Sequence, residues 1–140
     1  MTNKLFLETF IATGYVSELC CGKKIVTIEK YFGSAEDISV AKKPRVYKYQ
    51  EVQFAINNQI LLSIKVDLRT ELSNCFFDDL NFFAAKPDSY LIAYLCDKGY
   101  QYFERFDLAS DEYRCIEIES SGVAVFFRNG IVDSVLSFLK

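Results

Sequence analysis

Two stretches of this chain have the pattern of the same β-hairpin. Residues 52–66 and 123–137 align without a gap, and each has an apolar run, a turn that contains Asn, and a second apolar run. Asn58 and Asn129 fall at the same position, and Asn129-Gly130 is the dipeptide that most strongly indicates a two-residue hairpin turn. The repeat therefore predicts a duplicated β scaffold.

The pattern around the hairpins predicts one α+β domain, 1–140, built from two halves of about 1–70 and 71–140. In each half we expect helical segments followed by a β-meander, with the helices packed on one face of antiparallel sheet. One sheet or two are both compatible with the pattern, although a single sheet that joins the repeats would remove two edges.

Helical spacing and cap residues predict the helices. The first is expected to run from a cap at Thr2 or Asn3 to Gly14, and the second from about Lys23 to Phe32. A third helix is expected from Pro87 or Asp88 to Gly99, with Pro at its start and Gly just past its end. A turn at 34–37 with a linker to Pro44, and a short helix or packed loop at 70–86, complete the connections. The expected strands are 46–49, 52–56, 60–68, 100–106, 113–119, 123–128 and 131–138.

Composition excludes several classes of chemistry. The chain has no histidine, which removes Ser-His-Asp and Cys-His catalysis and most zinc sites. It has no glycine-rich phosphate motif, so neither a cofactor nor a metal is expected. Asp78 and Asp79 are adjacent, and neighbouring side chains rarely point into one catalytic site. An enzyme is therefore not expected.

The cysteines do not have metal-binding spacing. Five are present, and Cys20 and Cys21 are adjacent without the spacer that lets two thiolates share a metal ion. Free thiols in a reducing compartment are the simpler interpretation, and a vicinal disulfide between these two residues is the alternative. The apolar runs are shorter than the roughly 20 residues of a membrane helix, and the N-terminus lacks a signal-peptide pattern, so we expect a cytoplasmic protein that does not contact a membrane.

Charge is divided between the halves. Residues 1–70 carry ten Lys or Arg and seven Asp or Glu, whereas residues 71–140 carry six and twelve. A solvated surface and an acidic face for a basic partner are both compatible with this division. Nucleic acid is disfavoured as a partner because phosphate binding requires clustered Lys and Arg.

Several segments resemble small bacterial immunity proteins of contact-dependent growth inhibition and polymorphic toxin systems. The resemblance rests on turns and strands shared with that group. The segments are Tyr31–Ser39, Lys43–Tyr49, Val52–Asn58, Leu61–Ile64, Ser121–Phe127 and Asp133–Val135. It implies a non-enzymatic cytoplasmic protein that binds the C-terminal domain of a cognate toxin and blocks its active site.

The acidic second half adds an expectation about the partner. A basic toxin, such as a nuclease, would be attracted by carboxylates that take the place of phosphates. The candidate toxin-binding residues are Asp78, Asp79, Asp107, Asp111, Glu112 and Glu119, with Tyr113 as an aromatic anchor. Two other classes are an adaptor or regulatory module without a toxin partner, and an enzyme or ligand binder that uses a cavity between the sheet and the helices.

Overall fold

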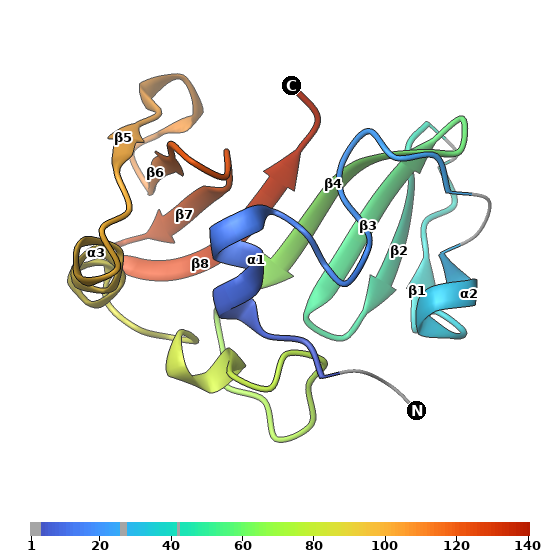
Figure 1. The fold of residues 1–140 in the computed structure, drawn as a ribbon, viewed down its shortest axis with the longest axis horizontal. Helices are drawn as coiled ribbons and strands as arrows, with labels where there is room; N and C mark the ends of the chain where they lie inside the picture. Colours follow the sequence, from blue (N-terminus) through green and yellow to red (C-terminus); the bar gives the residue numbers. More distant parts are fainter. Residues whose placement is uncertain (1–3, 26–27, 42) are drawn as a thin grey trace.

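The computed structural model describes residues 4–25, 28–41 and 43–140, and Figure 1 shows how their elements lie around one β-sheet. The described strands pair in the order β1-β2-β3-β4-β8-β7-β6-β5, and every neighbouring pair is antiparallel. The α+β class is confirmed, and the strands form one sheet. The strands are β1 (Asp37–Ile38), β2 (Arg45–Tyr49), β3 (Val52–Asn57), β4 (Ile60–Asp67), β5 (Tyr102–Glu104), β6 (Tyr113–Ile118), β7 (Ala124–Arg128) and β8 (Ile131–Phe138).

Two meanders meet through their last strands, β4 and β8. Lys65 lies opposite Leu136, which is its own counterpart in the sequence repeat. The flanking pairs follow the same symmetry. Ser63 lies opposite Phe138, and their counterparts in the repeat, Ser134 and Asp67, lie opposite each other. The two halves of the sheet are therefore related by an approximate two-fold axis that passes between Lys65 and Leu136.

The two hairpins turn in the same way. Asn58 and Gln59 both have positive φ, at 51° and 64°, and Asn129 and Gly130 have φ of 50° and 79°. Positive φ at both central residues is the requirement of the type I′ turn, whose twist matches that of the flanking strands. The Asn-containing turns predicted from the sequence are confirmed in both copies.

The hairpins also share an irregularity. The pairing shifts between Ala55 and Ile56 in the first copy and between Phe126 and Phe127 in the second, which are equivalent positions of the repeat. A β-bulge bends its strand and increases the local twist. Both halves therefore curve at the same place, and the curvature is part of the repeated unit.

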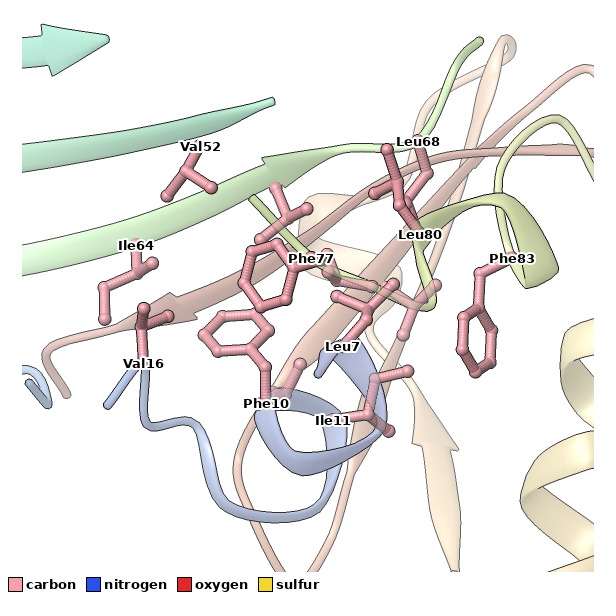
Figure 2. Packing of buried hydrophobic residues seen from close by; sticks show 14 of the residues in the cluster. Leu7, Phe10, Ile11, Val16, Val52, Ile64, Leu68, Phe77, Leu80 and Phe83 are labelled. Atoms are coloured by element: carbon pink, nitrogen blue, oxygen red, sulfur yellow. The ribbon is translucent and has the colours of Figure 1, made fainter. Parts of the chain in front are cut away.

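The helices pack on one face of this sheet. Leu7, Phe10 and Ile11 of α1 (Leu7–Thr13) are fully buried, and their i, i+3, i+4 spacing places them on one side of the helix. Figure 2 shows them directed at the sheet and at Phe77, whose ring centroid lies 6.3 Å from that of Phe10. The same core contains Phe32 of α2 (Glu29–Phe32), Leu80 of the 3-10 turn η1 (Leu80–Phe82), and Leu91 and Leu95 of α3 (Asp88–Asp97).

The sheet face away from the helices is called the open face below. In β4 the side chains of Ile64 and Val66 are buried in the core, and alternation along a strand places Lys65 on the opposite side. Leu136 follows the buried Val135 in β8 and points the same way as Lys65. At this equivalent position of the open face, the first copy of the repeat therefore has a lysine and the second copy has a leucine.

The start of α1 is stabilised from a distance. Thr2 and Asn3, the predicted caps, lie outside the described residues. The predicted start directly after them is wrong, because the helix begins at Leu7, Phe6 is extended and Leu5 forms a β-bridge with Phe77. The carboxylate of Asp79 accepts hydrogen bonds from the backbone N–H of Leu7 at 2.5 Å and of Glu8 at 3.0 Å. An aspartate that satisfies the first free N–H groups of a helix is an N-cap in function, although it comes from another segment of the chain.

The second predicted helix, which was expected from Lys23, is correct only for its last turn, α2. Residues 26 and 27 lie outside the described part of the chain. The segment before them is extended, and the N–H of Ile25 donates to the carbonyl of Gln59 at the tip of the first hairpin, at 2.6 Å. Pairing with the hairpin satisfies this backbone without a helix, which suits β-branched residues such as Ile25.

The strands and the third helix agree closely with those predicted from the sequence. The seven predicted strands are present, with ends that shift by one or two residues, and α3 lies where Pro87 and Gly99 placed it. The segment 70–86 contains both a loop and the short turn η1. The expected turn at 34–37 is partly wrong, because its end joins β1, which pairs with β2 and forms one edge of the sheet.

We predict that Asp79→Ala lowers the free energy of unfolding by about 1 kcal/mol, because two N–H groups of α1 lose their acceptor. The matched control is Asp78→Ala, since the neighbouring Asp78 side chain is exposed and has no hydrogen bond with the described residues. Urea denaturation of both variants measures the difference, and equal stabilities would contradict the capping role.

Candidate interaction surface

The connection between β5 and β6 combines exposed apolar and acidic side chains. It includes the 3-10 turn η2 (Phe106–Leu108) and is drawn in orange at the top of Figure 1. Phe106 is 81% exposed. Leu108 of the same turn is also exposed, as is Phe103 of the adjoining edge strand β5. Asp107 and Asp111 lie on the same loop. Exposed apolar side chains that gather beside charged residues are typical of a surface that contacts a partner.

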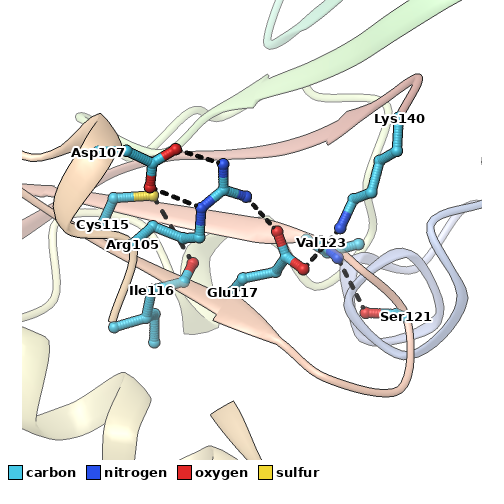
Figure 3. Close-up of polar contacts among 8 residues, drawn as sticks. All are labelled: Arg105, Asp107, Cys115, Ile116, Glu117, Ser121, Val123 and Lys140. Carbon is cyan, nitrogen blue, oxygen red and sulfur yellow. Dashed lines mark hydrogen bonds and ion pairs between the residues drawn. The ribbon is translucent and has the colours of Figure 1, made fainter. Parts of the chain in front are cut away.

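Arg105 holds the base of this loop. Its guanidinium donates to both carboxylate oxygens of Asp107, at 2.9 and 2.7 Å, and to Oε1 of Glu117 in β6 at 2.5 Å. Figure 3 shows the guanidinium between these two carboxylates, with Lys140 on the other side of Glu117. The Lys140 Nζ lies 2.6 Å from Glu117 Oε2. One carboxylate on the open face therefore ties together the loop, strand β6 and the C-terminal residue.

The burial of Glu117 explains why it needs both cations. Its exposed fraction is 7%, and a buried carboxylate without a partner is strongly unfavourable. The hydrogen bonds from Arg105 lower the pKa of Asp107, and the two acids raise the pKa of the Arg105 guanidinium. Arg105 and Asp107 therefore stay charged at neutral pH, and their contact persists there.

The far end of the loop is held by backbone and ring contacts. The Tyr113 N–H donates to the Ser110 hydroxyl at 3.2 Å, and Ser110 N–H donates to the Tyr113 carbonyl at 2.9 Å. The Arg128 guanidinium lies 5.9 Å from the centre of the Tyr113 ring and forms an ion pair of 3.6 Å with Glu112. Asp111 is exposed and has no ion pair within the described residues, so its charge is directed only at solvent.

The seven candidate residues do not form one surface. Asp107, Asp111 and Glu112 lie on the β5–β6 loop, and Tyr113 follows them as the first residue of β6. Asp79 is engaged by α1, and Asp78 beside it donates its N–H to the Leu5 carbonyl at 2.8 Å. Figure 1 shows this segment at the bottom of the view, away from the loop. Glu119 lies beyond the other end of β6, where its N–H donates to the Gln101 carbonyl.

Sequence reasoning missed the exposed Phe106. The alternation of Tyr100 to Phe106 predicts one strand that includes Phe106. The strand ends at Glu104, and η2 leaves Phe106 exposed to solvent. The available signal is Glu104-Arg105, two consecutive charged residues that interrupt the alternation just before Phe106.

Other chemistry is limited within the described residues. The five cysteines are free thiols, and burial raises the pKa of Cys115 to about 11, whereas Cys96 is exposed. Cys20 and Cys21 are half-buried. No group of three or more Cys, Asp or Glu side chains in the described ranges is placed to hold a metal ion. No helix of this part of the chain is both long and apolar enough to cross a membrane.

Comparison of the chain with models of known protein families, with curated proteins and with solved structures gives no match. The inference about function therefore rests on the residues and geometry of this chain.

We predict that Arg105→Gln raises the pKa of Asp107 towards its ordinary value of 3.8. Asp107 has a lowered pKa in the folded protein, so its contribution to stability is present above the ordinary value and is lost as pH falls through the lowered one. Titration of the carboxyl carbon resonances by NMR measures the change.

Asp67 provides the control. Its carboxylate accepts hydrogen bonds from Arg69, which lower its pKa in the same way, and neither residue contacts Arg105. The pKa of Asp67 should be unchanged in Arg105→Gln. An unchanged Asp107 pKa in this variant would show that Arg105 does not hold the loop.

Proposed function

We propose that this chain is a non-enzymatic immunity protein that binds and neutralises the C-terminal domain of a cognate toxin in the cytoplasm, through a surface that includes the β5–β6 loop. The observation that carries the proposal is the 81% exposure of Phe106 beside Asp107 and Asp111. The resemblance of the sequence to small bacterial immunity proteins supplies the class of partner.

The loop has the features of a preorganised binding element. A large apolar side chain such as Phe106 contributes binding energy when it enters a pocket of the partner and excludes water. Arg105 and Glu117 hold the loop before binding, which reduces the conformational entropy that association must remove. The acids around Phe106 favour a basic partner, because opposite fields increase the rate of encounter.

A nuclease is the toxin class that this charge best fits. Nuclease domains carry basic surfaces for phosphate, and an acidic loop can occupy such a surface without any catalytic group of its own. The alternative function is an adaptor that uses the same loop for a partner that is not a toxin. A gene neighbour that encodes a large secreted protein with a variable C-terminal domain would favour the immunity function.

The test takes a large secreted protein encoded by a gene beside that of this chain and expresses its C-terminal domain. Cells that express this domain should stop growing, and co-expression of the chain should restore growth. Calorimetry on the purified pair then gives the dissociation constant. Restored growth without a measurable complex, or a complex that does not restore growth, would contradict the proposal.

We predict that Phe106→Ser weakens toxin binding by about 30-fold, because an anchor side chain in a protein interface contributes about 2 kcal/mol. Asp111→Lys with Glu112→Lys should weaken binding by about tenfold and mainly slow association. The control is a charge reversal at Asp78, Asp78→Lys, because Asp78 belongs to the other acidic segment. A loss of binding with Asp78→Lys and not with the loop variants would move the surface to residues 71–79.

A further inference from the structure

A pocket of about 320 Å³ opens on the open face of the sheet, beside the β5–β6 loop. Leu136 of β8 and Phe126 of β7, which are side chains of the sheet itself, form its apolar floor, and Leu108 of the loop and Tyr113 of β6 also line it. Lys65 of β4, which pairs with Leu136 across the seam, is a further lining residue. Lys65 and Leu136 are the pair through which the approximate two-fold axis passes, so the pocket lies at the seam between the two halves.

The pocket depends on differences between the repeats. The counterpart of Leu136 is Lys65, and the counterpart of Phe126 is Ala55, so at these two positions of the open face the large apolar side chain belongs to the second half. The loop supplies Leu108 above this floor. The result is a pocket with an apolar floor next to the surface that carries Phe106, and its volume of about 320 Å³ is more than enough for one aromatic side chain.

Two opposite charges line the pocket. Asp133 accepts a hydrogen bond from the Ser134 hydroxyl at 3.2 Å, and Ser134 is 3% exposed. Neither Asp133 nor Lys65 forms an ion pair with another described residue. The neighbouring cation Arg69 is already neutralised by its two-pronged contact with Asp67. The pocket therefore offers the Asp133 carboxylate as an acceptor and the Lys65 ammonium as a donor, with no net charge. The hydroxyl residues Ser110, Tyr113 and Ser134 also line it.

We propose that this pocket binds a tyrosine side chain of the toxin domain, an inference that rests on the proposed function. The ring packs on Phe126, Leu136 and Leu108, which removes apolar surface from water. The phenol hydroxyl is both a donor and an acceptor, so it can donate to Asp133 and accept from Lys65.

Other side chains fit this arrangement less well. Lysine or arginine would pair with Asp133 but be repelled by Lys65, and aspartate or glutamate would pair with Lys65 but be repelled by Asp133. Phenylalanine would cover the floor but leave the two charged groups without new hydrogen bonds after it displaces water. A tyrosine side chain covers the floor and can form hydrogen bonds with both charged groups without adding a charge of its own.

The binding test uses small probes, so it does not require the toxin. Titration of the full chain with N-acetyl-tyrosine amide should shift the amide resonances of Phe126, Ser134 and Leu136, with saturation in roughly the millimolar range. N-acetyl-phenylalanine amide should bind about threefold more weakly, since it lacks the hydroxyl, and N-acetyl-arginine amide more weakly still. No saturation by the tyrosine probe up to its solubility limit, or tighter binding of either other probe, would overturn the proposal.

Two variants localise the site. Leu136→Lys introduces the residue that the first repeat carries at this position, and it should abolish binding of the tyrosine probe without unfolding the sheet. Ala93→Lys adds the same charge on the exposed side of α3 and is the control. Lys65→Met keeps the length of the side chain but removes the donor, so the preference for tyrosine over phenylalanine should fall to about one. Saturation that persists in Leu136→Lys would place the probe elsewhere and overturn the proposal.

The toxin complex separates this inference from the proposed function. If Phe106→Ser weakens toxin binding while Leu136→Lys leaves it unchanged, the pocket is not part of the interface, and the tyrosine inference fails although the proposed function remains. If the tyrosine probe binds and no toxin domain does, the pocket is a tyrosine site and the immunity function fails.

Discussion

The pairing of β4 with β8 is the contact on which the rest of the structure depends. Each meander alone would leave the backbone groups of its last strand unpaired, and antiparallel pairing at this seam satisfies both. The remaining edges are β1 and β5, which have two and three residues, so little strand is left open to another chain. The seam also places the apolar face of each meander on the same side of the sheet. There α1 covers both faces with Phe10 and its neighbours.

The symmetry of the backbone does not extend to the open face. The two hairpins share turn type, register and bulge, which are properties of the backbone and of a few turn residues. Side chains on the open face are free of these requirements, and there Ala55 and Lys65 are replaced by Phe126 and Leu136. The β5–β6 loop packs over that apolar half. The scaffold is thus repeated, whereas the exposed Phe106 and the pocket beside Leu136 belong to the second half.

Local features of the fold were predictable from the sequence, and distant ones were not. A type I′ turn and alternation along a strand are encoded by neighbouring residues, so β3, β4, β7 and β8 could be located before the structure was known. The cap of α1 by Asp79 joins segments that are far apart in the chain, and the pairing of Ile25 with the hairpin tip overrides a helical pattern. The acidic loop was identified by its charge, but the exposure of Phe106 depends on where β5 ends.

The Arg105–Glu117–Lys140 contact is best explained by specificity of conformation. A buried carboxylate and its cations lose hydration that their attraction only partly restores, so such a contact is weak evidence of stability. Apolar residues at these positions would keep the sheet folded. They would not fix the direction in which the loop leaves β5, because hydrophobic contacts lack the directionality of the paired N–H donors of Arg105. Glu117 therefore serves to position the loop, and Arg105 and Asp107, the residues on either side of the exposed Phe106, are held by this contact.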